Sequence, residues 1–172
     1  MDQKETNTIS TTWIENLAMD ELNMEESGVV FFNEHLNPNE YLEESSVNLV
    51  DEIRELFEIY VTKFNQFRGN QGSIKIFKIS NTVNDFMLFR NSLKLVVARR
   101  SPDVISIGFL SNTGGLYSAR LNQDLPATAE AHELRAQLGA FNDIAWTFNG
   151  ERINLDSMVK HYLTEFIKHS AR

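Results

Sequence analysis

The stretch from Ser73 to Leu121 most constrains the fold, because it is a succession of segments with the composition of β-strands. These segments read SIKIFKIS, DFMLFRNSLKLVVARR, DVISIGFLS and GLYSARL, and they are rich in β-branched and aromatic residues. The links between them are too short for the crossovers that parallel strands require. The sequence therefore predicts antiparallel strands, with a hairpin turn at Asn112–Gly115 and a turn at Ser101–Asp103. At Asn91-Ser92 it allows either a hairpin turn or one long bent strand.

Helical patterns flank this stretch. Residues 46–68 place apolar side chains at helical spacing, with Ser46 or Asn48 as N-cap and Gly69 after the last turn. Residues 127–138, ATAEAHELRAQL, predict a short helix that ends at Gly139. A final helix to about Ser170 is predicted behind a cap at Asn154 or Asp156.

A hairpin is predicted between the last two helices. Residues 141–148 read as a strand, and Asn149-Gly150 is a strong turn signal that leads back into residues 151–155. Together these elements predict an α+β domain over residues 46–172. In it a long N-terminal-side helix and a C-terminal helix pack on one face of an antiparallel sheet of about 4–6 strands.

Residues 1–45 are expected to form an acidic arm rather than part of the domain. Thr12 and Glu15 form a capping box that predicts a short amphipathic helix up to Leu22. A helix of this length is poorly stable alone, so it should dock on its own domain, on a second copy or on a partner. The residues expected to dock are Trp13, Ile14, Leu17, Leu22, Phe31 and Phe32.

Composition narrows the class of protein. The chain has 172 residues and no cysteine, which excludes disulfides, thiolate metal sites and cysteine nucleophiles. The N-terminal ten residues lack the apolar core of a signal peptide, and the longest unbroken apolar runs have four residues. We therefore expect a cytoplasmic protein that does not enter a membrane.

Charge is segregated along the chain. Residues 1–60 hold 15 acidic and 2 basic residues, a net charge of −13, whereas residues 61–121 have a net charge of +7. One interpretation is that the two halves neutralise each other, and another is that the basic strands meet an external anion or an acidic partner. The predicted patch comprises Lys75, Lys78, Arg90, Lys94, Arg99, Arg100 and Arg120.

Motifs for catalysis and for cofactors are lacking. No nucleophile elbow, phosphate-binding loop or zinc-protease motif occurs, so no catalytic residue and no cofactor is predicted. His161, Glu165 and His169 stand at i, i+4 and i+8 of the last helix and form a possible metal-binding stripe. A solvated helix flank explains this stripe more simply.

Three function classes follow. The first is a non-enzymatic protein-binding, adaptor or chaperone-like protein, expected to form a homodimer. In size, acidity and element order, residues 46–170 are similar to the small acidic chaperones of bacterial secretion systems, and the resemblance implies a dimer that holds an extended segment of its partner.

The second class is a small-ligand-binding or enzymatic domain with an aromatic cavity, lined by residues such as Phe86, Phe89, Phe109, Phe141 and Trp146. Packing in the core explains the same aromatic residues. The third class, nucleic-acid binding by the basic strands, is disfavoured by an isoelectric point of about 5.0.

Overall fold

The computed structural model describes residues 9, 11–29, 37–111, 116–117 and 131–171. The chain divides into two compact units, Met1–Pro38 and Asn39–Arg172. The first unit contains helix α1, Thr12–Ser27, which is longer than the helix predicted from Trp13 to Leu22. Gly28 ends it in the left-handed region, with φ of 69°.

The predicted capping box of α1 is wrong. Thr12 is the first helical residue rather than the cap, and Thr11 in the cap position makes no side-chain hydrogen bond. No residue of α1 is buried, and Trp13 is 65% exposed.

The second unit has the α+β architecture that the sequence predicts. Its elements are α2 (Pro38–Arg68), β1 (Lys75–Lys78), β2 (Phe86–Arg90), β3 (Leu93–Ser101), β4 (Val104–Ser111), β5 (Leu116–Tyr117), β6 (His132–Leu138), β7 (Ile144–Phe148), β8 (Glu151–Arg152) and α3 (Leu155–Ser170). Short 3-10 turns lie at Asn70–Gly72 and Ala140–Asn142.

The strands form one antiparallel sheet in the order β1-β2-β3-β4-β6-β7-β8, with β5 paired to β4 beside this path. This is more than the 4–6 strands expected. The hairpins at Asn91-Ser92 and Asn149-Gly150 are confirmed, and all four residues have the positive φ that tight hairpin turns favour. The predicted turn at Asn112–Gly115 lies outside the described residues.

The helix predicted over residues 127–138 is wrong where it is described, because His132–Leu138 is strand β6. Alanine, glutamate and leucine favour a helix in isolation, but β6 pairs with β4 on one side and β7 on the other, so its backbone groups are satisfied in the sheet. The strand predicted over residues 141–148 is shorter in the structure, because β7 begins at Ile144.

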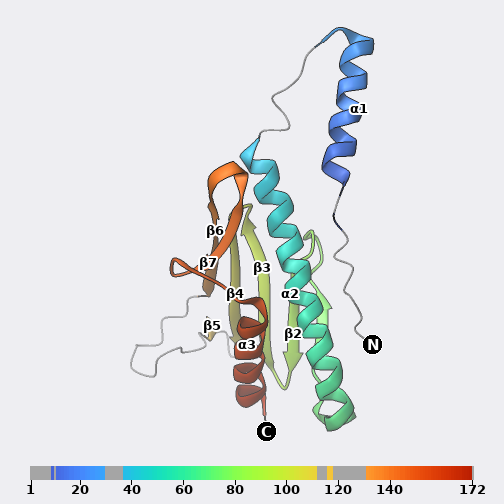
Figure 1. Cartoon of the computed structure of the whole chain (residues 1–172). Helices are drawn as coiled ribbons and strands as arrows, with labels where there is room; N and C mark the ends of the chain where they lie inside the picture. The colour runs from blue at the N-terminus through green and yellow to red at the C-terminus, as the bar shows by residue number, and fades with distance from the viewer. Residues whose placement is uncertain (1–8, 10, 30–36, 112–115, 118–130, 172) are drawn as a thin grey trace, which may run out of the picture. The chain divides into compact units, whose positions relative to one another are not determined.

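Helices α2 and α3 lie on the same face of the sheet (Figure 1). Leu49, Ile53 and Phe57 of α2 and Phe166 of α3 are buried against inward-facing strand residues, and Phe57 meets Phe86 edge to face. The Tyr60 hydroxyl of α2 donates a hydrogen bond to the Asp156 carboxylate of α3. Both helix caps nearest this core are as predicted: Gly69 follows α2, and the Asn154 side chain accepts from the Ser157 N–H.

Helix α2 begins at Pro38, earlier than the predicted start near Ser46. A proline suits the first turn of a helix, where its missing N–H costs no hydrogen bond. The side chain of Asn65 joins the end of α2 to the strand that follows, because it accepts from the Ile74 N–H at 2.8 Å and donates to the Ile74 carbonyl at 2.9 Å.

Candidate functional site

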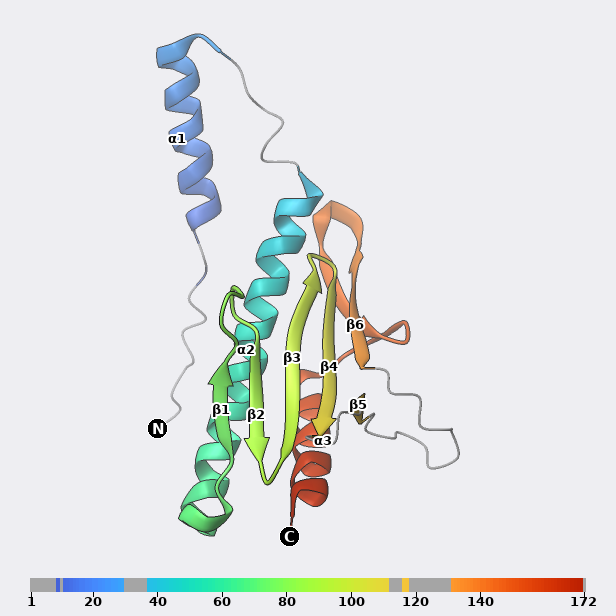
Figure 2. The same ribbon diagram turned by 180° about the vertical axis from the view of Figure 1, so that it is seen from behind.

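The face of the sheet opposite α2 and α3 is covered by neither of these helices (Figure 2). Side chains alternate between the two faces of a strand, so β2 shows which residues lie where. Phe86, Leu88 and Arg90 are buried on the helix-covered face, whereas Met87 and Phe89 are partly exposed on the other. We call this second surface, where it is formed by β1–β4, the outer face.

Two rows of side chains cross the outer face. Strand register places Lys75 opposite Phe89, Phe89 opposite Lys94, and Lys94 opposite Leu110. A second row runs from Phe77 through Met87 to Val96. Because directly opposed residues lie about 5 Å apart, the first row sets an aromatic ring between two ammonium groups, and the second is apolar.

A β-bulge adds a third cation to the outer face. The register between β3 and β4 shifts between Arg99 and Ser101, which leaves Arg100 as the extra residue. Its Nε donates to the Ser106 Oγ at 3.0 Å, and Ser106, which also lies on the outer face, is only 5% exposed. The bulge therefore directs the guanidinium along the sheet surface.

The outer face is basic and apolar. Within the described strands β1–β4, the outward positions hold Lys75, Lys94 and Arg100 but no acidic residue. Phe77 is 44% exposed, and Met87, Phe89, Val96 and Leu110 are partly exposed. Sheet faces with this much apolar surface normally pack against another layer.

The structure brings together three of the seven cations of the predicted patch. Lys78 is exposed at the end of β1, and Arg99 pairs with Glu43 of α2 at 3.2 Å on the helix-covered face. Arg120 lies outside the described residues.

The seventh cation, Arg90, is buried under α3 and only 5% exposed. Its Nη1 lies 3.3 Å from the Ser170 Oγ and 3.5 Å from the Ile167 carbonyl, and its guanidinium lies over the Phe64 ring. Burial, followed by repulsion from Arg68, lowers the pKa of Arg90. The carbonyl end of α3 favours a cation here, so Arg90 is a structural cap for this helix.

The aromatic residues proposed as a cavity lining do not gather around one space. Phe86 and Phe109 belong to the packed core, and Phe89 lies on the outer face. Phe141 is fully exposed, while Trp146 is nearly buried beneath α2.

The stripe on α3 does not form a metal centre among the residues that the structure describes, since no group of three or more histidine or carboxylate side chains there could hold an ion. His169 lies 3.3 Å from the Glu165 carboxylate, whereas the His161 Nε2 is buried without a hydrogen-bond partner.

A polar pair that sequence reasoning missed lies beside this stripe. The His132 Nδ1 and the Tyr162 hydroxyl are 2.7 Å apart, and the His132 ring also meets Phe148. Burial and the neighbouring His161 lower the pKa of His132, and burial raises the pKa of Tyr162. The sequence does not indicate this pair, because its local composition predicts a helix at His132.

No family model, curated protein or solved structure matches this chain. No helix among the described residues has the length and apolar character needed to cross a membrane.

The outer face also contains residues that sequence reasoning did not select, namely Met87, Val96 and Leu110. The alternation of β2 and β3 was visible in the sequence and could have assigned Met87 and Val96 to the same face as Lys94. The same alternation places Arg90 on the opposite face of β2 from Phe89, and so it excludes Arg90 from the outer face.

Proposed function

We propose that this protein is a non-enzymatic binding protein whose outer face holds an acidic amphipathic helix of another protein. The observation that carries the proposal is the first row of the outer face, where Phe89 lies between Lys75 and Lys94 beside the apolar second row. Apolar side chains of the partner would pack on Phe77 and Val96, and its carboxylates would meet the cations.

The chemistry of the face favours a protein over a nucleic acid. Phe77 and Phe89 are the only rings in the two rows, whereas Met87, Val96 and Leu110 present apolar surface on which a base does not stack. A helix that buries apolar surface and presents carboxylates matches both the apolar side chains and the cations of the outer face.

Helix α1 has the chemistry that the proposal requires of a partner. It exposes Trp13, Ile14, Met19 and Leu22 and contains acidic residues and no basic one. A peptide with its sequence is therefore a suitable probe, and in the full chain α1 is expected to compete with a partner. The expected dimer, in which α1 of one copy binds the other, is part of the same proposal.

The test measures binding of a fluorescent synthetic peptide of residues 9–29 to the full chain by anisotropy. The variant Phe89→Ala/Lys94→Ala should weaken binding at least tenfold, since it removes the centre of the first row. The matched control is Phe67→Ala/Lys63→Ala, an exposed phenylalanine–lysine pair on α2 with Lys63 over the Phe67 ring, and it should change affinity less than twofold.

Circular dichroism checks that both variants fold. Equal affinity of the two variants would overturn the proposal. Tighter binding of a single-stranded oligonucleotide than of the peptide, with a steep loss at high salt, would replace it with nucleic-acid binding.

A further inference from the structure

A groove runs between the first half of α2 and strand β7, on the helix-covered side of the sheet. It consists of two adjoining cavities of about 410 Å³ and 260 Å³ that share Leu49, Ile144 and Trp146 in their linings. The larger cavity is within the range of sites that bind small ligands or side chains. Nearly buried Trp146 is held in place there, because its Nε1 donates to the Ser45 Oγ of α2 at 3.0 Å.

One wall of the larger cavity is acidic. Tyr41, Glu44, Asn48 and Glu52 follow one another at helical spacing along α2 and line the cavity opposite Ile144 and Trp146. Both carboxylates are exposed, and neither forms an ion pair with any residue that the structure describes. Two unpaired carboxylates beside the ring of Tyr41 favour a cation, and a guanidinium also stacks well on aromatic rings.

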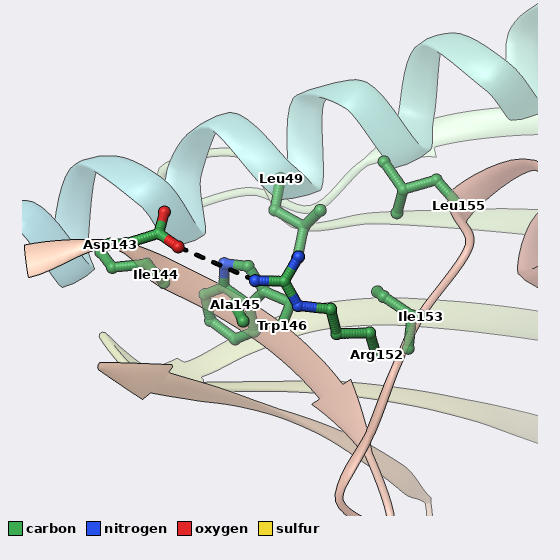
Figure 3. A pocket seen from close by; sticks show the side chains of 8 residues that line it. All are labelled: Leu49, Asp143, Ile144, Ala145, Trp146, Arg152, Ile153 and Leu155. Carbon is green, nitrogen blue, oxygen red and sulfur yellow. Dashed lines mark ion pairs between the residues drawn. The ribbon is translucent and has the colours of Figure 1, made fainter. Parts of the chain in front are cut away.

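Six of the eight residues that line the smaller cavity are apolar, and the other two are Asp143 and Arg152. Figure 3 shows Leu49, Ala145, Ile153 and Leu155 around it, with the Arg152 side chain reaching across toward Asp143. The Arg152–Asp143 contact is 3.7 Å, and the two side chains are 76% and 72% exposed. An exposed pair of this kind contributes little to stability, so an incoming side chain can displace it at small cost.

The turn between β6 and β7 carries an exposed aromatic residue two positions before Asp143, which lines the smaller cavity. Phe141 is fully exposed and has φ of 58°, as has Asn142. Leu138, which is 46% exposed, pairs with Ile144 of the groove lining. Bulky residues rarely adopt positive φ, and such strain gathers at sites where a residue must be presented to a partner.

We propose that this groove binds a basic, apolar peptide segment of a partner protein. An arginine or lysine side chain enters the larger cavity between Tyr41 and the carboxylates of Glu44 and Glu52. A neighbouring apolar side chain fills the smaller cavity against Leu49 and Trp146, and Phe141 packs on the outside of the segment. This site is distinct from the outer face and prefers the opposite charge, so it does not depend on the function proposed above.

The test uses the fluorescence of Trp146. The chain has two tryptophans, so the exposed Trp13 is first changed to phenylalanine to leave Trp146 as the sole reporter. The probe is an acetylated, amidated peptide Leu-Arg-Leu-Arg, and its charge-reversed form Leu-Glu-Leu-Glu is the ligand control. We expect a saturable change in Trp146 emission with the first peptide and none with the second.

Two sets of variants locate the binding. Glu44→Gln/Glu52→Gln should raise the dissociation constant at least fivefold, whereas Glu55→Gln/Glu58→Gln, with the same charge change at exposed positions of α2 that do not line the groove, should raise it less than twofold. Phe141→Gly should weaken binding while raising the melting temperature, a combination that a purely structural role would not give. The proposal is overturned by unsaturable emission, by equal effects of the two glutamate pairs, or by equal binding of both peptides.

Discussion

The Tyr162 hydroxyl on α3 and the His132 Nδ1 on β6 lie 2.7 Å apart, and this contact joins the last helix to a strand near the centre of the sheet. The His161 ring contacts the Tyr162 ring, and the Phe148 ring contacts the imidazole of His132. The arrangement favours the neutral form of His132, because burial penalises its charged form.

Stability should therefore fall in mild acid. The pKa of His132 is lowered in the folded protein, so the unfolded chain binds a proton that the folded chain does not, and the contribution is lost as pH falls below about 6.5, the ordinary value for histidine. Between pH 8 and pH 5, the free energy of unfolding should fall more in the parent than in the His132→Gln variant. The difference between the two falls should be no more than about 1 kcal/mol. Urea unfolding at both pH values measures this difference, with His169→Gln as the exposed control.

Replacing Arg90 should destabilise the domain strongly. Arg90→Ala removes the buried stem together with the guanidinium that lies over the Phe64 ring, and it leaves the end of α3 without its cation, at an expected cost of about 3 kcal/mol. Arg90→Met keeps the stem and should cost less. Chemical unfolding gives both values, and Lys94→Ala on the outer face should stay within about 0.5 kcal/mol. Similar costs for Arg90→Ala and Lys94→Ala would contradict the assignment of Arg90 as a helix cap.

Asn65 should be sensitive to a change of one atom. Asn65→Asp keeps the acceptor for the Ile74 N–H but replaces the donor by an oxygen that faces the Ile74 carbonyl. A loss of about 2 kcal/mol is expected for this variant, because a hydrogen bond to the carbonyl of the buried Ile74 is replaced by repulsion. Thermal unfolding at pH 7 measures it, and protection of the Ile74 amide from hydrogen exchange should persist in Asn65→Asp but not in Asn65→Ala.

Phe141→Gly should stabilise the protein although it removes a large side chain. Phe141 is fully exposed, so its loss exposes no core, and glycine adopts positive φ without steric cost. The expected gain is about 1 kcal/mol, a few degrees in melting temperature. Phe141→Ala should bring no such gain, because alanine retains the Cβ that disfavours this conformation. Calorimetry on the two variants makes the comparison.

Light scattering should show a dimer of the full chain. Removing residues 1–37 leaves α2 and every residue of the core cluster in place, because the cluster begins at Leu49. If α1 joins the two copies, the shortened chain will be a monomer of unchanged stability. A dimer in both forms would place the interface in the domain, and a full chain that is monomeric would remove self-association from the proposal.

The elements predicted correctly are those whose signals are local. The final helix combines the Asn154 cap with an apolar stripe that includes Val159 and Phe166, and both signals lie within the helix itself. The hairpin at Asn149-Gly150 is likewise determined by two adjacent residues that accept positive φ. In these places local propensity and tertiary structure agree.

The elements and sites that were not predicted depend on contacts between residues that are distant in the sequence. Residues 132–138 favour a helix by composition, and only the unpaired edges of β4 and β7 make them a strand. Likewise, the outer face depends on register, since Lys75 and Leu110 join one row only after three strand pairings are known. The groove beside Trp146 requires α2 and β7 to meet, and neither segment alone indicates it.

Strand order in this sheet follows chain order, apart from the short β5 that pairs beside β4. The hairpins β2–β3, β3–β4, β6–β7 and β7–β8 can therefore close through small loops, and local closure costs little chain entropy, whereas the pairing of β6 with β4 must also close residues 112–131. Such a topology has low contact order in its sheet, so the meander should form early and the two helices should dock later. On that view, substitutions in the β2–β3 turn will slow folding, whereas substitutions in α3 will mainly accelerate unfolding.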